Sequence, residues 1–136
     1  MSATAPARQR ILMVDDDQDF LDSCKAVLES ENFEVLTAND GAAGLELARR
    51  EKPDLIVMDM MMSTNTEGME VSRRIRETPE LRDLRLIMIT GVRSAMHLPF
   101  RFEPDSHHLP VDAILEKPVA PADLLREVRK QLNAER

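Results

Sequence analysis

The sequence contains no tryptophan, no tyrosine and a single cysteine, Cys24. One cysteine forms no internal disulfide, which fits a reducing compartment, so we expect a cytoplasmic location. The absence of Tyr and Trp removes the usual stacking platform for single-stranded nucleic acid. The net charge of −7 further disfavours nucleic acid and anionic membrane surfaces. The composition therefore predicts partners other than nucleic acid or membrane.

Long apolar runs are also missing. No stretch approaches the length of a membrane span, and residues 1–9, MSATAPARQ, lack the apolar segment of a secretory signal. We expect residues 1–9 to form a flexible N-terminal tail, because they carry nothing to bury. Residues 10–136 are expected to form one domain, since a chain of 136 residues leaves no room for a second.

Five short apolar runs alternate with segments of helical periodicity, which predicts an α/β fold with buried parallel strands. The predicted strands are Ile11–Val14, Phe33–Ala38, Leu55–Met58, Leu84–Ile89 and Ala113–Glu116. Between the first two, Asp17 is placed to cap a helix. In the next helix we expect an apolar stripe of Ala43, Leu45, Leu47 and Ala48.

Polar residues follow four of these runs at the point where each ends. They are Asp15 and Asp16, Asp59, Thr90 and Lys117. Because the carboxyl ends of parallel strands meet at one edge of a sheet, these side chains are expected to converge. Three carboxylates at contact distance favour a cation that neutralises them, and hard oxygen ligands suit Mg²⁺. Taken singly, Asp17 would be a helix cap and Asp59 a turn residue.

The acidic pair, the central Asp, the hydroxyl and the Lys117-Pro118 pair together form a specific pattern. In it the chain resembles response-regulator receiver domains, from about Arg10 to Leu132. The resemblance implies a doubly wound, flavodoxin-like fold with a five-stranded parallel sheet in the order 2-1-3-4-5. It also implies two-component signalling through a single domain, not metabolic catalysis: the protein would catalyse only its own phosphorylation and dephosphorylation, and signal by binding a protein partner that the sequence does not name.

The same resemblance assigns roles to individual residues. Asp59 would accept a phosphoryl group from a histidine kinase or a histidine phosphotransfer protein. Asp16 and Asp59 would contact Mg²⁺ directly, Asp15 through water, and the backbone carbonyl of Met61 would add a ligand. The Thr90 hydroxyl and the Lys117 ammonium would bind phosphoryl oxygens, and the Lys117–Pro118 peptide bond would be cis.

The chain departs from the receiver pattern near the site. Ile114 stands where receivers usually carry Tyr or Phe, and Ser63 stands where they usually carry Pro. The loop from Asp59 to Gly68 and the spacer from Thr90 to Lys117 are both longer than usual. We therefore expect intact chemistry with an altered output.

The spacer Val92–Asp112 contains three prolines and no lasting helical stripe. We expect the fourth helix of a receiver to be degenerate here or replaced by a loop, because proline removes backbone donors. This segment is expected to be the most mobile part of the domain and to report the phosphoryl state. It also holds His97, His107 and His108, whose spacing matches no metal site, so we expect solvated side chains.

Two alternatives remain open at this stage. A haloacid-dehalogenase-type phosphatase also uses a strand-end Asp, a hydroxyl, a Lys and Mg²⁺, but carries an Asp-x-Asp pattern followed by Thr on its first strand. Here the first strand leads into Asp15-Asp16-Asp17-Gln18. The other alternative is a receiver-like binding module that is never phosphorylated.

Overall fold

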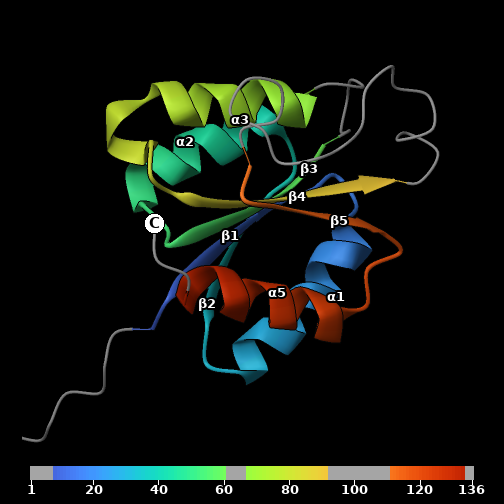
Figure 1. Cartoon of the computed structure of the whole chain (residues 1–136). Helices are drawn as coiled ribbons and strands as arrows, with labels where there is room; N and C mark the ends of the chain where they lie inside the picture. The colour runs from blue at the N-terminus through green and yellow to red at the C-terminus, as the bar shows by residue number, and fades with distance from the viewer. Residues whose placement is uncertain (1–7, 61–66, 92–110, 134–136) are drawn as a thin grey trace, which may run out of the picture.

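The computed structural model describes residues 8–60, 67–91 and 111–133. Five strands and four α-helices occupy these ranges (Figure 1). The strands are β1 (Arg10–Val14), β2 (Glu34–Ala38), β3 (Leu55–Asp59), β4 (Arg85–Gly91) and β5 (Ala113–Lys117). The helices are α1 (Gln18–Ser30), α2 (Gly41–Glu51), α3 (Glu67–Glu77) and α5 (Pro121–Asn133), with a short 3₁₀ helix, Pro79–Leu81, after α3.

The strands form one parallel sheet in the order β2-β1-β3-β4-β5, which confirms the predicted fold. Helices α2 and α3 cover one face of the sheet, and α1 and α5 cover the other (Figure 1). The predicted loss of the fourth helix concerns residues 92–110, which lie outside the described part of the chain. The same holds for the expected mobility of that segment, for its three histidines and for residues 1–7 of the predicted tail.

The core has two halves because successive residues of a strand point to opposite faces. Leu12, Ile56 and Met88 belong to the cluster on the α2–α3 side, whereas Met13, Val57 and Ile87 belong to the cluster under α1 and α5. Every residue of β3 is buried. Continuous apolar runs in the central strands are what a sheet covered on both faces requires.

Side-chain caps set the starts of two helices. Asp17 Oδ1 accepts the amide of Phe20 at 3.1 Å, and Asp40 Oδ1 accepts that of Ala43 at 2.8 Å. The predicted cap at Asp17 is thus confirmed. At the other end of α2, Lys52 takes a left-handed conformation with φ of 47°, and its amide donates to the Ala48 carbonyl.

The predicted apolar stripe of α2 was only partly right. Ala43 is exposed, and Leu45 and Leu47 are half-buried, whereas Gly41, Gly44 and Ala48 are buried. Glycine permits this close packing: a Cβ at Gly44 would lie 2.7 Å from a methyl group of Val14. The helix therefore meets the sheet along its smallest residues, a face that apolar periodicity does not reveal.

None of the helices in the described ranges has the length and apolar character needed to cross a membrane.

Candidate functional site

Strand register brings the predicted acidic residues together at the carboxyl end of the sheet. Val14 is paired with Met58, so Asp15, directly after β1, and Asp59, the last residue of β3, lie side by side. The Asp15 amide donates to the Ala38 carbonyl at 3.1 Å, which holds this turn to the end of β2. One carboxylate oxygen from each of Asp15, Asp16 and Asp59 lies within 4.8 Å of the others.

The three carboxylates differ in their surroundings. Asp15 is 1% exposed and Asp59 is 5% exposed, while Asp16 lies at the surface. Oδ1 of Asp15 accepts the amide of Asp17 at 2.9 Å. Its Oδ2 is buried and receives no hydrogen bond from any described residue. A buried acceptor without a donor is costly, so this oxygen favours a nearby positive charge or a water molecule bound to a metal ion.

Lys117, the last residue of β5, supplies the positive charge. Its Nζ lies 3.3 Å from Asp15 Oδ2 and 3.4 Å from Asp59 Oδ2. The contact with Asp15 is an ion pair without hydrogen-bond alignment, whereas Asp59 accepts a long hydrogen bond. Burial opposes charging of this ammonium, but attraction to Asp59 and Asp15 outweighs it, and the pKa of Lys117 is raised. The Lys117–Pro118 bond is cis, as expected.

Thr90 is buried in β4, which runs two residues beyond the predicted end at Ile89 to include Thr90 and Gly91. Asp59 is paired with Ile89, so Thr90 follows directly at the same edge of the sheet. Its hydroxyl donates to the Gly91 carbonyl at 3.2 Å. The structure thus brings Thr90 to the site edge with its hydroxyl directed to its own strand.

Two residues of the site were not foreseen from the sequence. Phe20 places its ring centroid 5.2 Å from Lys117 Nζ, and Asn39 donates to Gln18 Oε1 at 3.0 Å across the rim. Helical spacing in the sequence places Phe20 on the apolar face of its helix and gives no sign of a contact with Lys117. Met61, whose carbonyl was expected to bind metal, lies outside the described residues, as does Ser63.

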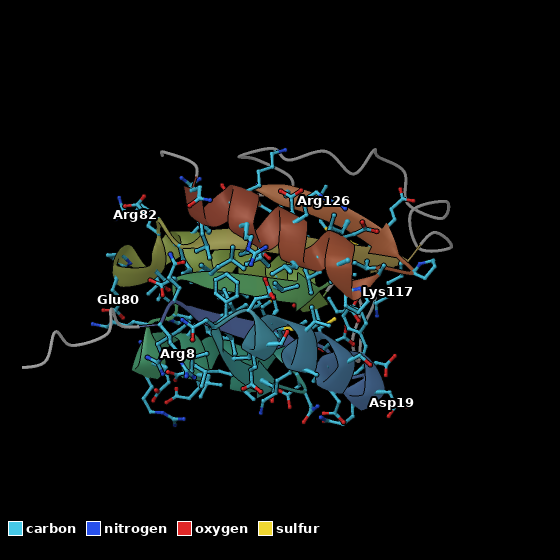
Figure 2. All side chains as sticks on the ribbon, turned by 90° about the horizontal axis from the view of Figure 1, so that it is seen from below. Arg8, Asp19, Glu80, Arg82, Lys117 and Arg126 are labelled. Atoms are coloured by element: carbon cyan, nitrogen blue, oxygen red, sulfur yellow. The ribbon has the colours of Figure 1, made fainter. Side chains whose placement is uncertain are left out.

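Figure 2 shows which of the labelled residues lie at each end of the sheet. Lys117 and Asp19, in the first turn of α1, lie toward one end of the sheet, and Glu80 and Arg82 lie at the other. Acidic side chains, one lysine and a strand-end threonine thus collect where parallel α/β sheets place their sites.

The family described as response regulator receiver domain matches residues 11–129. The chain belongs to this family. Receivers are signalling domains of two-component systems, so the resemblance inferred from the acidic pair, Asp59 and Lys117-Pro118 is confirmed at the level of the family.

The curated relatives include Response regulator MprA of Mycobacterium leprae, which is 34% identical over 123 residues, or 90% of this chain and 50% of the relative. Response regulator PleD of Caulobacter vibrioides is 37% identical over 83 residues, 61% of this chain and 18% of the relative. The chain therefore spans half or less of the length of these relatives.

Solved structures agree on the fold. A putative response regulator from Chloroflexus aurantiacus matches with a TM-score of 0.79 and 22% identity, over 94% of this chain and all of that one. The receiver domain of sensor histidine kinase PA1611 from Pseudomonas aeruginosa matches with a TM-score of 0.76 and 26% identity, over 94% and 100%. A magnesium ion is coordinated in the active-site cleft of that neighbour.

Proposed function

We propose that this receiver accepts a phosphoryl group on Asp59 from a phosphohistidine of a histidine kinase or a phosphotransfer protein. The observation that carries the proposal is the placement of the nearly buried Asp59 carboxylate beside a second buried carboxylate, Asp15, with the ammonium of Lys117 in contact with both. A carboxylate held beside a cation in this way is a ready nucleophile for an aspartyl-phosphate.

The step is an in-line displacement. An oxygen of Asp59 forms a bond to phosphorus while the bond from phosphorus to the histidine nitrogen breaks, and that nitrogen keeps the electron pair and takes a proton. Lys117 lies where its ammonium offsets negative charge on the transferred group. The Thr90 hydroxyl, next along the same edge, is the candidate donor to a phosphoryl oxygen, which requires it to leave the Gly91 carbonyl.

The carboxylate cluster fits Mg²⁺. Three hard oxygen ligands lie within 4.8 Å of one another, and the buried Oδ2 of Asp15 lacks a hydrogen-bond donor among the described residues. Asp16 and Asp59 would hold the ion directly, and Asp15 would act through water. The ion would supply charge neutralisation at the transferring oxygens. The magnesium ion in the related receiver domain from Pseudomonas aeruginosa supports this proposal.

Output goes to a protein partner in this proposal. Ile114 occupies the position in β5 where receivers usually carry an aromatic residue, so a rotamer change of that aromatic does not carry the signal here. The expected absence of nucleic-acid binding is not supported by the comparisons: one relative is named DNA-binding response regulator MtrA, and this chain covers 52% of it. That expectation, like the cytoplasmic location and the single-domain arrangement, stays a prediction.

Labelling with a small phosphodonor tests the proposal directly. Purified wild-type protein with Mg²⁺ and acetyl phosphate should gain the mass of one phosphoryl group, and peptide mapping should place it on Asp59. Asp59→Ala should gain none while keeping cooperative urea unfolding, because removing one of three close like charges costs little stability. Asp83→Ala, at an exposed position outside the cluster, is the matched control and should label like wild type.

Equal labelling of Asp59→Ala and wild type would overturn the assignment of the acceptor. A wild-type protein that takes no label but hydrolyses small phosphoesters would favour the phosphatase. A protein that does neither would favour a binding module without phosphorylation.

A further inference from the structure

Lys117 has a third neighbour besides its two carboxylates. The Phe20 ring lies beneath its ammonium, with 5.2 Å between Nζ and the ring centroid. A cation within about 6 Å of an aromatic centroid is attracted by the negative face of the ring. Since the distances to Asp15 and Asp59 are 3.3 and 3.4 Å, neither carboxylate alone dictates where the ammonium sits.

The turn between β1 and α1 fixes the ring relative to the acidic cluster. Asp15 Oδ1 accepts the amide of Asp17, and Asp17 Oδ1 in turn accepts the amide of Phe20. The same short segment therefore presents both the Asp15 carboxylate and the Phe20 ring to Lys117. Phe20 is half-buried and packs against the core cluster under α1 and α5, so its ring cannot swing freely into solvent.

A lysine ammonium is held in place less firmly than a group on a rigid side chain, because its four-carbon chain is flexible. In addition, 30% of the Lys117 side chain is exposed to solvent. A water molecule competing for the ammonium would draw it away from Asp59. The ring occupies one side of the ammonium, so water is excluded from that side. Its negative face also attracts the cation.

We propose that Phe20 is a positioning residue for the phosphorylation reaction, acting through Lys117 by holding its ammonium over Asp59 and Asp15. The inference rests on the proposed function for its kinetic consequence, while the contact itself is independent of that function. The proposal gives the first turn of α1 a positioning role in the reaction, in addition to the roles of the acidic pair that precedes it.

A double-mutant cycle on the phosphorylation rate is the first test. With acetyl phosphate and Mg²⁺, Phe20→Leu should slow labelling of Asp59 by about two- to fivefold, the loss expected for one partly exposed cation–π contact. In a Lys117→Met background, Phe20→Leu should cause no further loss, since the ammonium is already gone. Phe20→Tyr keeps the ring and should label at nearly the wild-type rate.

Phe33→Leu is the matched control. Phe33 follows α1 in the sequence, and its buried ring belongs to the core cluster against which Phe20 packs. Its effect on the labelling rate should be the same with and without Lys117. If Phe20→Leu slows labelling equally in both backgrounds, or if Phe20→Tyr is as slow as Phe20→Leu, Phe20 serves packing alone and the proposal is wrong.

A second cycle separates this proposal from the proposed function. In urea unfolding of the unphosphorylated protein, the drop in midpoint caused by Phe20→Leu should be smaller in the Lys117→Met background than in wild type. Absence of that difference overturns the contact. A wild type that takes no label but retains the difference would instead overturn the phosphoryl-acceptor assignment and leave the Phe20–Lys117 contact standing.

Discussion

Residues of the site that look equivalent in the sequence differ in how deeply they are buried. Asp15 and Asp16 are adjacent, yet Asp15 is buried with one oxygen lacking a donor among the described residues, while Asp16 is exposed. Asp15 is therefore the carboxylate whose charge most needs Lys117 and a cation. Asp16 keeps its hydration and is free to reorient toward a ligand.

Cys24 provides a test of the electrostatics behind the site. Burial, assisted by the nearby charge of Asp15 and opposed by Lys117, raises the pKa of its thiol from 9.0 to about 11. The folded state thus holds this proton more tightly than the unfolded state does. The resulting contribution to stability is fully present below about pH 9 and is lost as the pH rises through about 11.

We expect the free energy of unfolding of wild type to fall by roughly 1–2 kcal/mol more than that of Cys24→Ala across this pH range. Urea unfolding at a series of pH values measures the difference, and the alanine variant subtracts the titration of every other group. Parallel pH profiles for the two proteins would contradict the raised pKa of Cys24.

At the scale of elements, the start of α3 is pressed against the strand that carries Asp59. The Gly68 amide donates to the Met60 carbonyl at 2.8 Å. A Cβ at Gly68 would lie 2.3 Å from the Asp59 carbonyl oxygen and 2.6 Å from the Met60 Cα. These are backbone atoms of the central strand end, so they have little room to yield.

Gly68→Ala should therefore lower the free energy of unfolding by about 1–3 kcal/mol, the usual cost of overpacking. Gly41→Ala is the control: its Cβ would meet the ends of the Glu67 and Val71 side chains at 2.7 Å, and side chains shift more readily than backbone. Chemical denaturation should rank Gly68→Ala below Gly41→Ala, and the opposite order would refute the argument.

At the edge of the sheet opposite the site, Asp112 links α3 to β4 and β5. Its Oδ2 accepts Arg76 Nη2 at 3.0 Å and the Leu86 amide at 2.8 Å, and its Oδ1 lies 3.8 Å from Arg85 Nη1. Arg76 also donates to the Leu84 and Arg82 carbonyls. The Arg76 and Asp112 side chains are only 18% and 16% exposed.

Asp112→Ala should cost about 1–3 kcal/mol of stability, because it leaves a strand amide and a mostly buried guanidinium without this acceptor. Asp123→Ala breaks the exposed pair with Arg126 and should change stability by less than about 0.5 kcal/mol. The two urea midpoints compared with wild type decide the matter; equal small shifts would mean that Asp112 contributes no more than a surface charge.

For the whole molecule, the apolar runs predicted the strands and the meeting of the acidic cluster with Lys117, and the resemblance to receiver domains predicted the order of the strands. Central strands buried on both faces leave a strong apolar signal in the sequence, because a parallel sheet is covered by helices on both sides. Side-chain contacts between elements were not predictable in this way: the ring of Phe20 under Lys117 and the glycine face of α2 depend on packing, which apolar periodicity does not encode.

Mg²⁺ should stabilise the entire domain, because a ligand that binds only the folded state shifts the unfolding equilibrium. The carboxylates of Asp15, Asp16 and Asp59 come together only when β1 and β3 are paired, so the unfolded chain offers no comparable site. Assuming millimolar affinity, typical of an ion that keeps much of its water, 10 mM Mg²⁺ should add about 1.4 kcal/mol to the free energy of unfolding.

Asp16→Asn removes a ligand at an exposed position and should abolish most of this gain with little effect on stability in the absence of the ion. Thermal and urea unfolding of both proteins with MgCl₂, and with NaCl at matched ionic strength, separate specific binding from screening. An equal gain in both salts would mean screening without specific binding, and an equal gain in both proteins would place the ion elsewhere.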